Sequence, residues 1–347
     1  MAGVGAGSSK KFFAAILLGL ILAIVLNRVV ASTRQKPEDA AVDGGTRHLQ
    51  QLLRGRSLLQ GSSSSQGALL IDYMGANGDT SLQFSDLQAT VSAFPAVQFI
   101  FPLAFAIDAD ASGNPQNGIF SPYWVTSLDS QSAQLFKQQN PNVKLMVSLA
   151  GATQYINDSN PSQPVNWYDP ASIDEWVSNA VSSITSLAST YSLDGIDIDY
   201  ETYPSGSASF TSCIGQVIST LKSSNTISVA SIAPFDDTLS IYADLFANYA
   251  SVIDYVNYQF YGDGLTTQSE YVNRFNTVAA SFSSSSNKVL ASVEVGGRGL
   301  QGNDFIGAAT QLRNIIAGIM NWDVDHSKNS NPPFALEQSV ATFLTSA

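Results

Sequence analysis

The sequence is poor in the residues that build disulfides and zinc sites. Its 347 residues include one cysteine, Cys213, and two histidines, His48 and His326. A single cysteine excludes an intramolecular disulfide, so the fold must be held by its core. A metal site of the Cys/His type is nearly excluded. A Ser-His-Asp triad would need one of the two histidines, and His48 falls in a segment that we interpret below as a linker.

Positive charge is also scarce. The chain has 16 Lys and Arg against 28 Asp and Glu, a net charge of −12, and only 13% of its residues are charged. Nucleic acid binding needs a basic surface, so nucleic acid is not expected as a partner. The acidic excess identifies no other partner. A hydrophobic fraction of 44% is enough for a sizeable core, in one large domain or two small ones.

The apolar run FFAAILLGLILAIVL (12–26) follows two lysines and is typical of a secretory signal peptide. Small residues in VVA (29–31) offer a cleavage site. The alternative is an uncleaved signal anchor that extends to residue 30 and makes a type II membrane protein. Either form predicts the secretory pathway, with an extracellular or vacuolar location for the cleaved form. We therefore interpret residues 1–31 as a signal peptide or signal anchor.

Residues 32–67 have the composition of a flexible linker or propeptide. The segment is polar, rich in Gly, Ser, Gln and Arg, and ends in QGSSSSQG. Such a composition cannot bury a core.

From residue 68 onward, β-rich runs alternate with segments of helical periodicity. In 172–191, apolar residues recur at spacings of three and four behind the candidate N-cap Ser172. Cys213 lies on the apolar face of a second such segment and is expected in the core. Eight β-rich runs are found, at 68–74, 97–107, 143–151, 194–201, 227–235, 253–261, 288–297 and 317–324.

Strands that alternate with helices favour parallel pairing. Eight units over about 280 residues match a single (β/α)8 TIM barrel, which we assign to residues 68–347. A doubly wound open sheet is the alternative. No glycine-rich phosphate fingerprint follows the first strand, so a dinucleotide site is not supported.

The segment DGIDIDYE (194–201) concentrates acids in a chain that has few charges. Side chains alternate faces along a strand, so Asp197, Asp199 and Glu201 share one face, about 6.5 Å apart from Cα to Cα. The apolar residues between them share the other face and can pack under helices. The acids therefore point into the barrel, and Glu201 lies at the C-terminal end, where barrel enzymes carry out their chemistry.

Buried neighbouring carboxylates are costly, and one of them takes a raised pKa. A raised pKa on the last acid suits a general acid. One alternative is a structural network paired with Lys or Arg, but no basic residue lies on the inferred inner faces nearby. The other is a divalent-cation site, which would draw oxygen ligands from several strand ends.

DGIDIDYE resembles the signature D-G-x-D-x-D-x-E of family-18 glycoside hydrolases. The likeness to the plant chitinase 2-like branch continues through VKLMVSLAG (143–151), ISVASIAPFDD (227–237), IDYVNYQFYGDG (253–264), KVLAS (288–292) and Trp322-Asp323. It implies a retaining, substrate-assisted mechanism without a protein nucleophile. By position, Glu201 would protonate the glycosidic oxygen, and Asp199 would hold the substrate acetamide as an oxazolinium ion forms. Asp197 would exchange a proton or hydrogen bond with Asp199.

The resemblance implies four further site residues. Tyr261 would hydrogen-bond the acetamide in the transition state, and Gln259 would contact substrate nearby. Trp322 would form the aromatic floor under the sugar, and Tyr73 would line the same pocket. By strand parity, Asn257 shares a face with Gln259 and Tyr261.

The sequence departs from the family pattern in Ser148-Leu149-Ala150-Gly151, where the family has S-x-G-G. The extra methyl of Ala150 is expected to point toward the acids and could lower activity. About 21 residues separate the last two strands, too few for the α+β insertion domain of processive chitinases. An open groove would favour endo-cleavage of β-1,4-linked N-acetylglucosamine chains.

The resemblance thus predicts a monomeric chitinase-like enzyme that needs no cofactor or metal and binds chitin or N-acetylglucosamine oligosaccharides. Two alternatives remain at this point. One is a catalytically weak or inactive oligosaccharide-binding or storage protein on the same barrel. The other is a hydrolase for a different N-acetylglucosamine glycan.

Overall fold

The computed structural model describes residues 68–110, 112–151, 165–282 and 286–346. The predicted signal or anchor segment (1–31) and linker (32–67) lie outside the described residues, so both remain predictions. Among the residues described, no helix combines the length and the apolar character needed to cross a bilayer.

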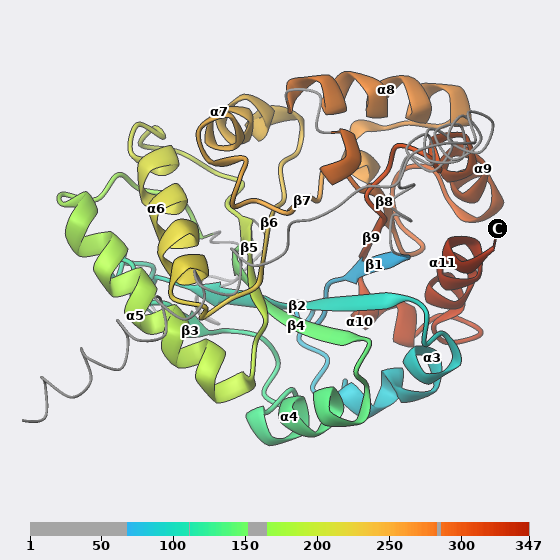
Figure 1. Ribbon diagram of the computed structural model, residues 1–347, viewed down its shortest axis with the longest axis horizontal. Helices are drawn as coiled ribbons and strands as arrows, with labels where there is room; N and C mark the ends of the chain where they lie inside the picture. The colour runs from blue at the N-terminus through green and yellow to red at the C-terminus, as the bar shows by residue number, and fades with distance from the viewer. Residues whose placement is uncertain (1–67, 111, 152–164, 283–285, 347) are drawn as a thin grey trace, which may run out of the picture. The chain divides into compact units, whose positions relative to one another are not determined.

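A curled parallel sheet forms the centre of the domain (Figure 1). Its strands run in the order β7-β6-β5-β4-β2-β1-β9-β8. At the two ends of this order, Val256 and Val289 form a parallel bridge, and the N–H of Leu290 donates to the carbonyl of Val256 at 3.0 Å. The arrangement is consistent with the expected (β/α)8 barrel. The eight strands are β1 (Leu69–Asp72), β2 (Gln98–Ile107), β4 (Val143–Ala150), β5 (Gly195–Asp199), β6 (Val229–Ile232), β7 (Tyr255–Val256), β8 (Ala291–Glu294) and β9 (Ile319–Trp322).

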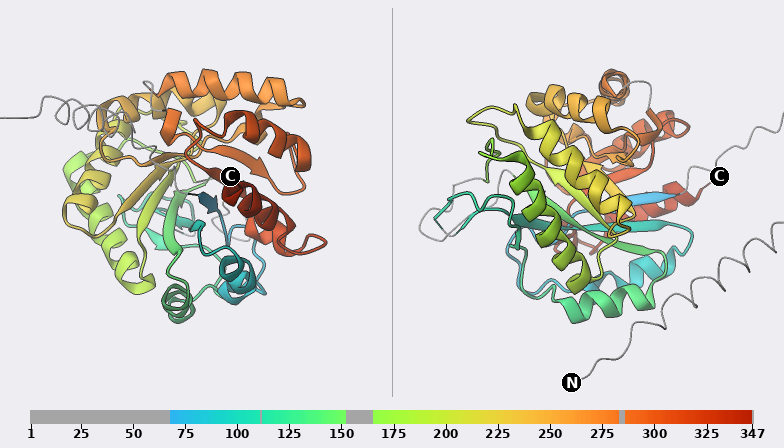
Figure 2. Two further views of the ribbon diagram at one scale, coloured as in Figure 1. Left: turned by 45° about the vertical axis from the view of Figure 1, so that its right-hand side comes forward. Right: turned by 60° about the vertical axis from the view of Figure 1, so that its left-hand side comes forward.

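Helices surround the strands and cover the outer face of the sheet (Figure 2). The α-helices are α3 (Gln88–Ala93), α4 (Ser130–Gln139), α5 (Ile173–Tyr191), α6 (Phe210–Ser223), α7 (Leu239–Tyr249), α8 (Gln268–Ser281), α9 (Gly302–Leu312), α10 (Val324–Lys328) and α11 (Ala335–Thr345). Short 3-10 helices are η2 (Phe84–Leu87), η3 (Asp236–Thr238), η4 (Phe260–Asp263) and η5 (Ser286–Lys288). The connection from β8 to β9 contains the single helix α9, as the short spacing predicted.

Local signals account for the longest helix. The side chain of Ser172 accepts the N–H of Glu175 and so caps α5, as predicted. Trp176, Ala180 and Ile184 form the buried stripe of α5. On α6, Cys213 is fully buried among apolar neighbours, which confirms it as a core residue.

Two strand predictions need correction. A short strand, β3 (Ser121–Pro122), pairs antiparallel with the end of β2 and was not expected. The sixth predicted strand (253–261) is wrong in its second half, because β7 ends at Val256 and the chain turns into η4. Gly264 ends η4 with φ +68°, a conformation that glycine adopts without strain.

Burial also perturbs an acid on the outer side of the sheet. Asp108 follows β2 and is 1% exposed. Its carboxylate accepts hydrogen bonds from the hydroxyls of Tyr200 and Tyr168, each at 3.0 Å, and from Nε1 of Trp176 at 3.3 Å. Burial raises the pKa of Asp108 to about 6, although these donors oppose the rise.

We predict that stability falls as pH rises, in part through Asp108. A carboxyl whose pKa is raised in the folded state contributes stability below its unfolded pKa that is lost as pH rises through about 6. Between about pH 4.5 and about pH 7.5 this group alone should cost about 2 kcal/mol. Urea unfolding of the parent and Asp108→Asn at both pH values should show a smaller fall for the variant. Equal falls would contradict the assignment.

Candidate active site

Strand β5 places its acids inside the sheet. Asp197 and Asp199 are buried, at 0% and 3% exposure, and Glu201 follows two residues after the strand, half-buried. Gly195 begins the strand where a Cβ would lie 2.4 Å from the carbonyl oxygen of Val229, so only glycine allows this approach to β6. Asp197 and Asp199 thus lie on β5 as predicted, whereas Glu201, predicted on the same strand, lies beyond its end.

Four side chains from other strands converge on Asp197. Its Oδ2 accepts the hydroxyls of Tyr73 at 2.8 Å and Ser148 at 2.7 Å. Its Oδ1 accepts the hydroxyl of Ser231 at 2.6 Å and Nδ2 of Asn257 at 3.2 Å. Burial raises the pKa of Asp197, but these four donors favour its ionised form and oppose the rise. The network thus makes a buried negative charge tolerable.

Asp199 and Glu201 form an interacting pair. Burial first, and then the charges of Glu201 and Asp197, raise the pKa of Asp199 well above its usual value. Burial also raises the pKa of Glu201. Two close carboxyls resist joint ionisation, so the pair holds a proton at pH values where isolated acids would have lost theirs.

Gln259 links this pair to Tyr261. Its Nε2 donates to Glu201 Oε1 at 2.7 Å and to Asp199 Oδ1 at 3.3 Å, while its Oε1 accepts the Tyr261 hydroxyl at 3.2 Å. Gln259 caps η4, and Tyr261 lies within that helix. A 3-10 turn therefore brings these two side chains to the acids. They were predicted to share one face of a strand, but they do not lie in a strand.

A cavity of about 550 Å³ opens above the acids, within the range of small-molecule sites. It brings together five of the residues predicted from the sequence, namely Asp199, Glu201, Gln259, Tyr261 and Trp322. The Trp322 ring packs against Phe105, with ring centroids 6.1 Å apart. The cavity also has lining residues that the sequence reasoning missed, namely Asn77, Phe105, Phe235, Gly262, Glu294 and Arg298.

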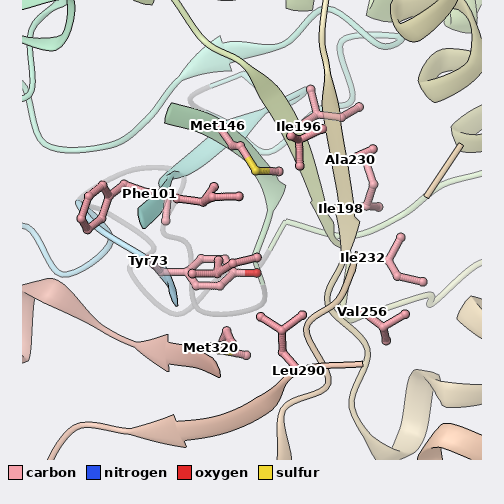
Figure 3. Close-up of a cluster of buried hydrophobic side chains, with 14 of the residues drawn as sticks. Tyr73, Phe101, Met146, Ile196, Ile198, Ala230, Ile232, Val256, Leu290 and Met320 are labelled. Carbon is pink, nitrogen blue, oxygen red and sulfur yellow. The ribbon is translucent and has the colours of Figure 1, made fainter. Parts of the chain in front are cut away.

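Tyr73 lies beneath this cavity and is not among the residues that line it. It is 1% exposed, packs on Trp322 with ring centroids 5.5 Å apart, and contacts the acids through Asp197. Figure 3 shows its phenol among Met146, Met320 and Leu290, with the oxygen pointing to the side where Ile198 and Ile232 lie. In this structure Tyr73 supports the carboxylates from below.

Two further sequence expectations can be placed. Ala150 is fully buried and pairs with Asp199 in the sheet register, and its φ of +80° is a conformation that favours glycine. His326 lies near Asp323, with Nδ1 2.7 Å from Oδ1, and near Asn77. In the part of the chain that the structure describes, no group of three or more His, Cys, Asp or Glu side chains could hold a metal ion.

Comparison with known proteins identifies the family. The sequence model described as "Glycosyl hydrolases family 18" matches residues 68–326. The chain belongs to family 18 of the glycosyl hydrolases. Its curled sheet, with Asp197 and Asp199 inside, is therefore that of a family-18 domain.

Relatives of this family-18 chain include plant chitinases. Chitinase 1 of Tulipa saxatilis subsp. bakeri is 37% identical over 273 residues, covering 76% of this chain and 85% of that protein. The catalytic domain of a GH18 chitinase from the fern Peteris ryukyuensis is 43% identical, with a TM-score of 0.73, covering 80% of this chain and all of that one. A "RuBisCO-associated protein" of Glycine max is 33% identical over 162 residues, which are 46% of this chain and 56% of that protein.

We predict that Tyr73→Phe destabilises the family-18 domain by about 1.5–3 kcal/mol, because it removes a buried donor to a charged acceptor. Urea unfolding near neutral pH measures the loss. The matched control is Tyr203→Phe, whose hydroxyl donates at 3.1 Å to the neutral carbonyl of Tyr200, with an expected cost of about 0.5–1.5 kcal/mol. A loss for Tyr73→Phe no greater than the control's would contradict the role given to Asp197.

Proposed function

We propose that the chain is a chitinase-like hydrolase that cleaves β-1,4-linked N-acetylglucosamine chains within their length. The observation that carries this proposal is the meeting of Asp199, Glu201, Gln259 and Tyr261 in one cavity above the buried Asp197. Family membership and the chitinase relatives support it. The single-helix connection between β8 and β9 supports an open groove and hence endo-cleavage.

In the first step, Glu201 donates its proton to the glycosidic oxygen while the bond to the anomeric carbon breaks. The acetamide oxygen of the same sugar attacks that carbon, and a cyclic oxazolinium ion forms with retention over the two steps. Asp199 accepts a hydrogen bond from the acetamide N–H and balances the positive charge. The Tyr261 hydroxyl donates to the acetamide oxygen, and Trp322 carries the sugar ring.

In the second step, Glu201 acts as the base. It takes a proton from a water molecule that attacks the anomeric carbon, the oxazolinium opens, and the acetamide is restored. The raised pKa of Glu201 suits both roles, because the same group must hold a proton and then accept one. Gln259 holds the Glu201 carboxyl in place for both transfers. Because the nucleophile belongs to the substrate, the chain itself needs no nucleophilic residue.

The second candidate is an oligosaccharide-binding protein without activity. The partial likeness to the RuBisCO-associated protein of Glycine max supports this second candidate. The strained Ala150 beside Asp199 supports it as well. In either case the proposed ligand is chitin or an N-acetylglucosamine oligosaccharide, and the proposed route is the secretory pathway, as a secreted, vacuolar or type II anchored protein. We propose that the domain acts as a monomer.

The proton donor can be tested with Glu201→Gln. We predict that this variant loses at least about 10²-fold in cleavage of N-acetylglucosamine tetramer, the typical weight of general acid catalysis, while still binding it. Product release is followed by mass spectrometry and binding by calorimetry. Glu175→Gln, an exposed acid in the first turn of α5, is the matched control and should cleave like the parent.

Two results would decide against the hydrolase. Cleavage by Glu201→Gln at the parent rate would exclude Glu201 as proton donor. Binding of the tetramer by the parent without any product would favour the binding protein.

A further inference from the structure

Among the described residues that line the cavity, one is basic. Arg298 lies in the loop from β8 to α9 (295–301), and the other charged lining residues are the acids Asp199, Glu201 and Glu294. The family signature does not contain this arginine, and the sequence predicted no basic residue near the acids. The question is what one positive charge does among three carboxyl groups.

Glu294 holds the arginine in a fixed place. Arg298 Nε donates to Glu294 Oε2 at 3.0 Å, and Nη2 donates to Oε1 at 3.2 Å, so the pair is bidentate. The backbone N–H of Arg298 also donates to Glu294 Oε2 at 2.6 Å. Between them, a Cβ on Gly297 would lie 2.5 Å from the Glu294 carboxyl. A side chain at this position would therefore force the Glu294 carboxyl to move.

The same loop packs against Tyr261. The Arg298 guanidinium carbon lies 5.5 Å from the centre of the Tyr261 ring, within the range of a cation–π contact. Gly299 has φ +74°, and a Cβ there would lie 2.9 Å from the Tyr261 Cα. The ion pair thus reaches the side chain that is proposed to bind the acetamide.

The charges that act on Glu201 come from three parts of the fold. Asp199 on β5 pairs with it, and the charge of Glu201 acts on the phenols of Tyr203 and Tyr261. The charge of Arg298 acts on Glu201, and Glu294 lines the same cavity beside Arg298. Burial raises the pKa of Glu201, and the positive charge of Arg298 acts against that rise. Arg298 is the only cation in this set.

We propose that Glu294 and Arg298 are a charge-tuning pair for the reaction, in which Arg298 offsets the negative charge of Asp199 and Glu201 and Glu294 holds the guanidinium over Tyr261. Both are positioning residues, since they act through Glu201 and Tyr261. The inference rests on the proposed hydrolase function for its role in turnover, but its electrostatic content can be measured without turnover.

Substitutions of the two residues are expected to have opposite effects on the pH profile. Arg298→Gln removes the positive charge, so Glu201 keeps its proton to higher pH, and the basic limb of the kcat/KM profile should move up by about half a pH unit. Glu294→Gln keeps a side-chain oxygen that can accept from the guanidinium but removes the carboxylate charge. Arg298 then stays in place without its counter-charge, and the same limb should move down by a similar amount. The double variant should lie close to the parent. All shifts should shrink at high salt, because Arg298 is 65% exposed.

The experiment compares the parent, both single variants and the double variant. Profiles of kcat/KM on N-acetylglucosamine tetramer are measured beside carboxyl ¹³C NMR titrations, with the Glu201 signal assigned by its loss in Glu201→Gln. Arg313→Gln is the matched control, because Arg313 is an arginine whose guanidinium contacts Ser346 and Phe343 away from the cavity. It should move neither the profile nor the titration.

Opposite shifts in both readouts would support the tuning pair. Shifts in the same direction, or a loss of kcat with an unmoved limb and an unmoved Glu201 titration, would overturn it in favour of a structural role. If the parent cleaves no tetramer, the hydrolase proposal fails, and the NMR titration still decides whether the pair tunes Glu201.

Discussion

The burial of Asp197 and Asp199 on one face of β5, with Glu201 just beyond the end of the strand, is the constraint on which the rest of the structure depends. Removing such charges from water is costly unless donors or protons compensate. Asp197 is compensated by donors from β4, β6 and the ends of β1 and β7. Such donors can converge only if the parallel strands curl around β5. The curl of the sheet is therefore needed to stabilise the buried charge of Asp197.

The ends of strands β1 and β9 carry site residues on the inner face of the sheet and a separate polar network on the outer face. On the inner face they carry Tyr73 and Trp322, which contact each other beneath and beside the cavity. On the outer face Asn321 Nδ2 donates to Asp72 at 2.9 Å and to Glu337 of α11 at 3.2 Å. Burial, followed by the charge of Glu337, raises the pKa of Asp72 well above its usual value. This outer network fastens α11 to the strands that support the floor of the site.

Regular elements of this chain could be predicted from its sequence because their signals are local. The alternation in β5 gave the inward face of Asp197 and Asp199, and Ser172 gave the start of α5. The end of β7 could not be predicted, because VNYQFY (256–261) suits a strand by composition and only its tertiary surroundings favour the turn into η4.

Three of the missed residues, Asn77, Phe235 and Arg298, are brought to the site by loops. Glu294 and Arg298 meet through a glycine-rich loop whose path depends on packing against Tyr261. Tyr73 was found in the sequence, but its contact with Asp197 depends on the curl of the sheet over a separation of 124 residues. Pattern and propensity describe the strands well, whereas side-chain encounters across strand ends are properties of the assembled domain.

The central claim is that Asp199 on β5 and Glu201 just after it act on the same sugar of the substrate. A crystal structure of the Glu201→Gln variant with bound N-acetylglucosamine tetramer tests it most directly. The account predicts that one acetamide lies between Asp199 and Tyr261, with the glycosidic oxygen within about 3 Å of the side chain at position 201. An oligosaccharide bound away from these carboxyls, or with its acetamide turned from Asp199, would contradict it.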